Sequence, residues 1–379
     1  MNNRIFLIDH QSFNSLAAYD RCMIEGIDDF EFFFFGNENN KDRPDKKNVH
    51  YYPVFRYNRY KNNILRGLSY VMSLLIIMYY GIRIRPLAIH LQWIRVWIAD
   101  WTMIKIFKNC LKSKFVFTVH NLLPRNNKPQ NRKHFTTLYH FADLLIAHTE
   151  TTKKDLIEDF NVDPNKITVM PHGLLEVPVS DEELEESKNK YENLYGFGDK
   201  LIFAALGAQS SYKGTDLAIE AWRNNSDLVN NKNLVLLVAG KNIDLQFPKE
   251  LPENIILISE MISNPDFKYL LRRTDVMVLP YRIIDQSGLL LSLIMERKPY
   301  CSTQVGELTK PFEIADVGWI IPEITSESIA DTILKIAENP ESIATKKANE
   351  EGWTRLQREY SWQRSNEILS DAYQKLMGA

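Results

Sequence analysis

Short apolar segments alternate with longer amphipathic ones along the first half of this chain. The short segments predict strands at residues 4–9, 30–35, 87–91, 115–120, 144–148 and 167–170. The longer segments repeat apolar residues at helical spacing and predict helices at residues 63–83, 94–111, 131–141 and 151–160. Strands separated by helices indicate an α/β fold, in which helices cover both faces of a parallel sheet.

A second alternation follows the acidic segment SDEELEESKNKYENLYGFGDK, which predicts a domain boundary between Leu174 and about Lys200. Beyond it we predict strands at 201–207, 234–240, 255–259, 276–281 and 299–303, and helices at 215–222, 266–274, 288–297, 327–341 and 361–378. We place two domains at residues 1–176 and 177–357. Both should be doubly wound, so we expect ligands beyond the carboxyl ends of the strands, in a cleft between the domains.

Two segments of the second domain have the character of phosphate-binding loops. In LGAQSSYKGTDLAIEAW, Lys213 and Gly214 stand near a helix start, where free N–H groups and the helix dipole favour an anion. A glycine turn with a solvated lysine explains the same residues. Downstream, Gln286, Ser287 and Gly288 would present donors at another helix start, although Ser287 alone would be an ordinary N-cap. The two loops together favour a nucleotide diphosphate.

Composition adds a charge asymmetry to this picture. Hydrophobic residues make up 45% and charged residues 25%, which is ordinary for a soluble globular protein, and the net charge is −2. Between Tyr51 and Lys133, however, fifteen Lys or Arg stand against the single acid Asp100, with Tyr and Trp interleaved. This favours an anionic membrane surface over nucleic acid, for which no recognition motif is present.

The apolar run that begins at Gly67 is near the short limit of about 20 residues for a membrane span. Serines and tyrosines interrupt it, so we expect a buried or membrane-surface helix. The three cysteines are far apart and fit no disulfide or metal-ligand spacing, which favours a reducing, cytoplasmic compartment. The N-terminus lacks the layout of a signal peptide.

Six segments, in order, carry a family resemblance: LAIHLQW, FTVHNLLP, KITVMPHG, the Lys213 loop, the later TDVMVLPY…DQSGLLLSLIMERKPYCSTQVGEL, and the C-terminal EYSWQRSNEILSDAYQKL. Over nearly its whole length the chain resembles the group-one glycosyltransferases of the GT-B fold, which include bacterial polysaccharide and lipopolysaccharide sugar transferases. The resemblance implies two Rossmann-like domains, with a C-terminal helix, about residues 358–379, crossing back to the first, acceptor-binding domain.

The resemblance also implies roles for individual residues. Lys213 and the backbone of Ser287, Gly288 and Leu289 would hold the donor diphosphate, and His120 would sit across from the donor sugar. The full donor set that we predict is Gly207, Gln209, Lys213, Gly214, Tyr281, Asp285, Gln286, Ser287, Gly288, Leu289, His172 and Gly173. For the acceptor or the membrane we predict Arg56, Arg59, Lys61, Arg66, Trp93, Asn121 and Arg125.

Some positions depart from the family pattern. Ala208 and Gln209 stand where the family often has an arginine, and Asp285 would replace the first of two glutamates. The second glutamate falls near Ser292 or Leu293, and Glu296 lies too far along, which puts the usual contact to the donor ribose in doubt.

The catalytic residues are less well determined. His120 is our first choice, although a histidine at a strand end is often structural. Asp9 and His10, at the end of the first strand, are candidates for a general base, unless Asp9 is only a turn or N-cap acid. The chain has no D-x-D sequence, so we expect no metal, and we leave the stereochemical outcome open.

These observations predict a cytoplasmic enzyme, peripheral on the inner membrane face, that transfers a hexose from a UDP- or GDP-sugar to a lipid-linked or growing glycan. Two alternatives remain: a UDP-sugar 2-epimerase of the same architecture, and a non-catalytic partner subunit with a decayed donor site.

Overall fold

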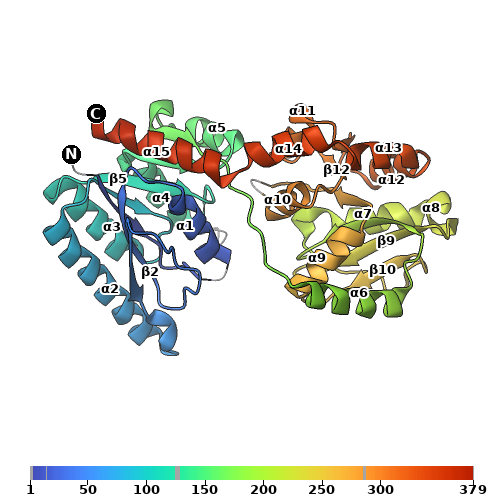
Figure 1. Ribbon diagram of the computed structural model, residues 1–379, viewed down its shortest axis with the longest axis horizontal. Coiled ribbons are helices and arrows are strands. Elements are labelled where there is room, and N and C mark those ends of the chain that lie inside the picture. Colours follow the sequence, from blue (N-terminus) through green and yellow to red (C-terminus); the bar gives the residue numbers. More distant parts are fainter. Residues whose placement is uncertain (1–2, 14, 124–128, 285–286, 379) are drawn as a thin grey trace. The chain divides into compact units, whose positions relative to one another are not determined.

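The computed structural model describes residues 3–13, 15–123, 129–284 and 287–378, which form two compact units (Figure 1). The first comprises Met1–Gly173 with Tyr360–Ala379, and the second comprises Leu174–Glu359. The sequence prediction put the changes at 176/177 and 357/358, within three residues of these positions.

The first unit contains a seven-stranded parallel sheet with the strand order β3-β2-β1-β4-β5-β6-β7. The strands are β1 Arg4–Ile8, β2 Glu31–Asn37, β3 Val49–Phe55, β4 Ala88–Leu91, β5 Lys114–Val119, β6 Leu144–Ala147 and β7 Ile167–Val169. Strand β3 was not predicted, because its Pro53 and its mostly half-exposed side chains obscure the pattern. A proline is tolerated there because β3 lies at the edge of the sheet.

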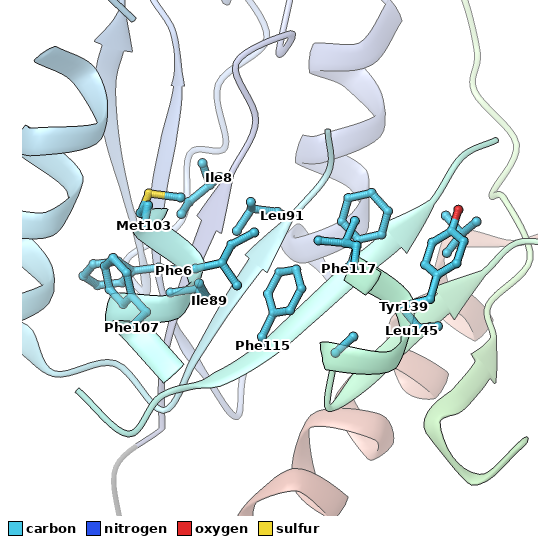
Figure 2. Packing of buried hydrophobic residues seen from close by; sticks show 14 of the residues in the cluster. Phe6, Ile8, Ile89, Leu91, Met103, Phe107, Phe115, Phe117, Tyr139 and Leu145 are labelled. Carbon is cyan, nitrogen blue, oxygen red and sulfur yellow. The ribbon is translucent and has the colours of Figure 1, made fainter. Parts of the chain in front are cut away.

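Helices alternate with these strands along the chain. They are α1 Ser15–Glu25, η1 Tyr57–Arg59, α2 Asn63–Ile84, α3 Trp97–Lys105 with the π-turn η2 Ile106–Cys110, α4 Pro129–Phe141, α5 Glu150–Glu158, η3 Pro164–Lys166 and α15 Trp362–Gly378. Figure 2 shows the core under α3, where Phe6, Ile89 and Phe115 from three neighbouring strands pack with Met103 and Phe107. This apolar layer holds the strand ends in place.

The last helix, α15, belongs to the first unit, as the family resemblance implied. The hydroxyl of Tyr373 lies 2.5 Å from Nδ1 of the fully buried His90. Ser370 donates a hydrogen bond to Asp29, and Ser365 donates one to the carbonyl of Pro171. These contacts join α15 to a sheet whose strands come from much earlier in the sequence.

The second unit contains a six-stranded parallel sheet with the order β10-β9-β8-β11-β12-β13. The strands are β8 Leu201–Leu206, β9 Leu234–Ala239, β10 Ile255–Ile258, β11 Val276–Leu279, β12 Tyr300–Thr303 and β13 Gly318–Ile321. The helices are α6 Asp181–Tyr195, η4 Ser211–Lys213, α7 Thr215–Asn224, α8 Ser226–Asn230, α9 Asn264–Arg273, α10 Gly288–Met295, α11 Lys310–Ile314, α12 Ser326–Ala337, α13 Pro340–Lys347 and α14 Glu350–Glu359.

The acidic segment used to predict the boundary is mostly helix α6 of this second unit. A capping box of Ser180 and Glu183 begins it, and its three acids in the first turn complement the helix dipole. Its Lys190 pairs with Asp266 of α9 at 2.9 Å. The chain therefore changes units at Gly173, before the composition changes.

Each sheet reverses its strand order at one place, between β1 and β4 in the first unit and between β8 and β11 in the second. Ligands of doubly wound folds bind beyond the carboxyl ends of the strands at such a switch point. The segments that follow these four strands are therefore the places to look for a site.

We expect Tyr373→Phe to lower the free energy of unfolding by about 1–3 kcal/mol, because it leaves Nδ1 of buried His90 without its partner. Urea unfolding of the full chain measures this change. Tyr195→Phe is the matched control, since Tyr195 makes ring contacts but no hydrogen bond within the described part of the chain. Equal stability of the two variants would contradict the role of this contact.

Candidate functional site

In the second unit, the loops that follow β8 and β11 are in direct contact. Gly214 has a left-handed backbone with φ of +66°, and a Cβ added there would lie 1.9 Å from the carbonyl oxygen of Pro280. Gly207, at the end of β8, also has a positive φ of +91°. Any side chain at position 214 would clash with the Pro280 carbonyl, so a glycine is required there. Gly214 therefore sets the distance between the two predicted phosphate loops.

Lys213 lies where these loops meet. Its ammonium is 5.8 Å from the centre of the Tyr281 ring, and a Cβ at Gly207 would lie 3.5 Å from Nζ. Burial lowers the pKa of Lys213, and within the described part of the chain no carboxylate pairs with it. A partly buried cation without a counter-ion is a favourable place for an anion.

The start of α10 adds further polar groups to this place. Ser287 is the N-cap, and its hydroxyl accepts a hydrogen bond from the N–H of Leu290 at 3.4 Å. Gly288 is exposed, with open space where a Cβ would be. The first N–H groups of a helix have no partner within the helix, so those of Gly288 and Leu289 suit an anion. Asp285 and Gln286 lie outside the described residues.

The hydroxyl of Tyr281 is buried beside Ser287. Burial raises the pKa of Tyr281, and the neighbouring Ser287 partly opposes this shift. Among the described residues the Tyr281 hydroxyl has no hydrogen-bond partner. Buried hydroxyls are usually hydrogen-bonded, and this one is available to a ligand.

Gln209 does not fit its predicted role as a donor contact. Its side chain is buried, and its amide nitrogen donates to the carbonyls of Ala205, Gly207 and Ala239. Its amide oxygen accepts a hydrogen bond of 2.6 Å from Thr215. Both ends of the amide are engaged within the protein, so Gln209 braces the loop from inside.

Arg282 is a residue that the sequence reasoning missed. Its guanidinium makes a bidentate pair with Asp216 of α7, at 2.8 and 2.7 Å, and donates to the carbonyl of Ser211. The available signal was an arginine just after a strand together with an acid in the first turn of α7. This pair ties the segment after β11 to the loop after β8.

Glu296 lies at the C-terminal end of α10, away from Ser287 and Gly288 at its start. It pairs with Arg272 at 2.7 Å. Glu296 is therefore engaged in an ion pair at the opposite end of α10 from Ser287 and Gly288.

The first unit gathers four histidines in or just beyond neighbouring strands. They are His90, His120, His148 and His172, of β4, β5, β6 and β7 in that order. The rings of His120 and His148 lie 5.2 Å apart, and those of His148 and His172 lie 5.8 Å apart. Tyr19 of α1 packs against His120, His148 and His172.

His120 has one ring nitrogen fixed and the other available. Its Nε2 lies 2.8 Å from the amide oxygen of Gln92, and because that oxygen can only accept, Nε2 carries the proton. Nδ1 is then an acceptor, and no described residue donates to it. Trp93 stacks on the imidazole at 4.4 Å, and its buried indole N–H has no hydrogen-bond partner among the described residues.

Burial, and then the neighbouring histidines His148, His172 and His90, lower the pKa of His120 well below its usual value. Burial also lowers the pKa of His90 and His148 to about 3 each. The cluster is therefore neutral at physiological pH. His120 can accept a hydrogen bond from a sugar hydroxyl, but it cannot stabilise negative charge as a cation.

Asp9 and His10 are not placed as predicted. Their side chains are only 1% and 4% exposed, so neither can take a proton from an acceptor at the surface. Asp9 lies beside the fully buried Asp20, and burial raises the pKa of Asp9 to about 7. His10 sits among aromatic rings, with Nδ1 3.1 Å from the hydroxyl of Tyr57.

The remaining predicted residues have varied surroundings. His172 and Gly173, predicted to contact the donor, belong to the first unit, where Gly173 packs on the ring of Trp362. Among the predicted acceptor residues, Arg59 is paired with Glu38, which lies outside the segment used to count charges. The others differ in exposure: Arg56 and Lys61 are exposed, Arg66, Trp93 and Asn121 are part-buried, and Arg125 lies outside the described residues.

Comparisons with known proteins cover both units. The family model for glycosyltransferase family 4 matches residues 28–174, and that for glycosyl transferases group 1 matches residues 187–352. A mannosylfructose-phosphate synthase from Agrobacterium fabrum is 26% identical over 41% of this chain and 36% of its own length. The chain spans about two fifths of the length of each curated relative it matches.

Solved structures share the fold over the full length. The Anabaena protein HepE in complex with UDP matches with a TM-score of 0.68 at 13% identity, over 98% of this chain and 100% of that one. A protein described as a UDP-N-acetylglucosamine 2-epimerase from Listeria monocytogenes matches with a TM-score of 0.58 at 13% identity, over 100% and 98%. These matches establish the GT-B fold, with two Rossmann-like units.

Asp20→Asn should stabilise the protein at neutral and higher pH. Burial, and then the charge of Asp9, raise the pKa of Asp20, so the folded chain holds a proton that the unfolded chain releases above pH 4. Stability from this group is therefore lost as the pH rises. In urea unfolding, the variant and the unmodified chain should have similar free energies of unfolding near pH 4. Above that pH, the free energy of the variant should exceed that of the unmodified chain by an amount that grows by up to about 1.4 kcal/mol per pH unit.

The matched control is Asp199→Asn, which removes an exposed carboxyl group of the second unit. If the stability difference between Asp20→Asn and the unmodified chain did not change with pH, the pKa of Asp20 would not be raised in the folded chain.

Proposed function

This chain belongs to the group 1 glycosyltransferases, and we propose that it transfers a hexose from a nucleotide diphosphate sugar, UDP- or GDP-linked, to a glycan acceptor. The observation that carries the proposal is the ammonium of Lys213 at the β8/β11 switch point, beside the hydroxyl of Tyr281 and the start of α10. Among the described residues this ammonium has no counter-ion and this hydroxyl makes no hydrogen bond.

These three groups suit the leaving group of the reaction. When the bond between the sugar and the diphosphate breaks, negative charge develops on the phosphate oxygens. A cation, a hydroxyl and the first N–H groups of a helix offset this charge without having to reorganise. We propose that they do so without a metal ion, and that addition of EDTA leaves transfer unchanged.

We propose that the histidine cluster of the first unit binds the reacting sugars. Nδ1 of His120 would accept a hydrogen bond from a sugar hydroxyl, and the indole N–H of Trp93 would donate one. We further propose a lipid-linked or growing glycan as the acceptor and the cytoplasmic face of a membrane as the place of work. Support for this comes from the basic and aromatic composition of residues 51–133.

Lys213→Ala should weaken UDP binding by about 10- to 100-fold, because hydrogen bonds to charged groups contribute about 1.5–3 kcal/mol. Thermal shift with UDP, GDP, UDP-sugars and GDP-mannose measures binding and also identifies the donor, since a ligand that binds the folded state raises its melting temperature. Lys232→Ala, an exposed lysine of the same unit, should bind like the unmodified chain. No shift with any nucleotide would instead favour a non-catalytic partner subunit.

His120→Ala should abolish transfer and leave the affinity for the nucleotide nearly unchanged, because the proposed diphosphate contacts all belong to the second unit. Measuring transferase activity and nucleotide affinity on one preparation separates the two effects. His50→Ala, in the same sheet but paired with Glu31, should keep full activity. A loss of nucleotide affinity in His120→Ala would disprove this division of roles.

The shared fold of the Listeria protein makes one control worthwhile. If UDP-N-acetylglucosamine incubated alone with the protein gives its 2-epimer, the chain is an epimerase and the transfer proposal is wrong.

A further inference from the structure

Helix α2 exposes an apolar face that no element of the described residues covers. Its outward residues include Ile64, Leu68, Val71, Leu75 and Ile82, which are 74%, 58%, 41%, 48% and 62% exposed. They recur at helical spacing over about 27 Å of helix. On the surface of a soluble protein, this side of a helix is normally charged or polar.

By length and composition alone, α2 is long and apolar enough to cross a membrane, and 28% of its most apolar 18-residue stretch is buried. Its opposite face, however, is built into the first unit. Leu74 and Ile77 belong to the core, Tyr70 donates to buried Asp100 at 2.7 Å, and Gly81 packs closely on the ring of Phe107. With one face fixed to the sheet, α2 can lie in a membrane surface but cannot span it.

Most charges around this face are positive, although Arg59 is paired with Glu38 from an earlier segment. Between Tyr51 and Ala99 the sequence contains seven Lys or Arg and no acid. Arg56 and Lys61 precede the helix and are exposed, and Arg83 stands in its last turn. Asp100, the first acid after this segment, is 1% exposed and lies beneath the helix.

A pocket of about 390 Å³ borders the apolar face. Strand β3 and η1 line one side of it with Arg56 and Tyr60, and α2 lines the other with Met72 and Ile76. Since Met72 and Ile76 are also exposed, the pocket opens next to the apolar face. It therefore offers an arginine beside aliphatic side chains, the arrangement that a lipid phosphate and its chains require.

We propose that α2 is a membrane-docking helix that lies in the surface of an anionic bilayer, with its apolar face among the acyl chains and the phosphate of one lipid at Arg56. The role that we give to docking, bringing the chain to a lipid-linked acceptor, rests on the proposed function. Docking itself is inferred from the geometry of α2 and does not depend on that function.

The test is co-sedimentation of the full chain with phosphatidylcholine vesicles, with and without phosphatidylglycerol. The unmodified chain should sediment with the anionic vesicles, and added salt should weaken this binding. Leu68→Gln with Leu75→Gln should weaken it by about 100-fold, at about tenfold for each partly inserted leucine. The matched control is Ile243→Gln with Met261→Gln, which changes exposed apolar residues of the second unit.

Other results would overturn the proposal. Equal vesicle binding by the α2 double variant would exclude docking through this face. Conversion of a dimer to a monomer by the same variant, with vesicle binding unchanged, would assign the face to a second copy of the chain. Retention in membranes through alkaline carbonate would indicate a span.

A second variant and a second readout keep the result interpretable. Arg56→Gln with Lys61→Gln changes only exposed cations, and it should reduce binding to anionic vesicles alone. The UDP-induced thermal shift should be the same in both double variants and the unmodified chain. Vesicle binding without any UDP shift would support the docking helix while contradicting the proposed function.

Discussion

The candidate donor site depends on one close approach, that of Gly214 to the carbonyl of Pro280. It brings together two segments that are more than sixty residues apart and follow adjacent strands of the sheet. The pair of Arg282 and Asp216 then fixes them, so that Lys213, Tyr281 and the start of α10 share one small region. Because these groups are held by backbone and by a bidentate ion pair, little reordering is needed when an anion binds.

The first unit contains a cluster of buried, uncharged histidines. Four neutral histidines are held in a nearly dry environment by hydrogen bonds to backbone, threonine, tyrosine and glutamine. Such a cluster could not form if the rings were charged, and burial keeps them uncharged. The rings pack on one another, and His120 keeps Nδ1 as an acceptor to which no described residue donates.

Much of this was accessible from sequence, and the parts that were not have physical reasons. Buried parallel strands, the Lys213 loop and the Ser287 loop were found because apolar runs and glycines mark them locally. Strand β3 was missed because an edge strand tolerates Pro53. The role of Gln209, the Arg282–Asp216 pair and the burial of Asp9 and His10 arise from contacts distant in sequence, which no local pattern encodes. Charge counting misjudged Arg59, whose partner Glu38 lies in an earlier segment.

The return of α15 to the first unit also orders events during synthesis of the chain. His90 meets its partner Tyr373 only after 283 further residues have been made. At about 5–20 residues per second, this takes roughly 15–60 s. Throughout that time the first sheet exists without its last helix, while the whole second unit emerges and can fold. The nascent first unit therefore lacks its last helix until the whole second unit has been made.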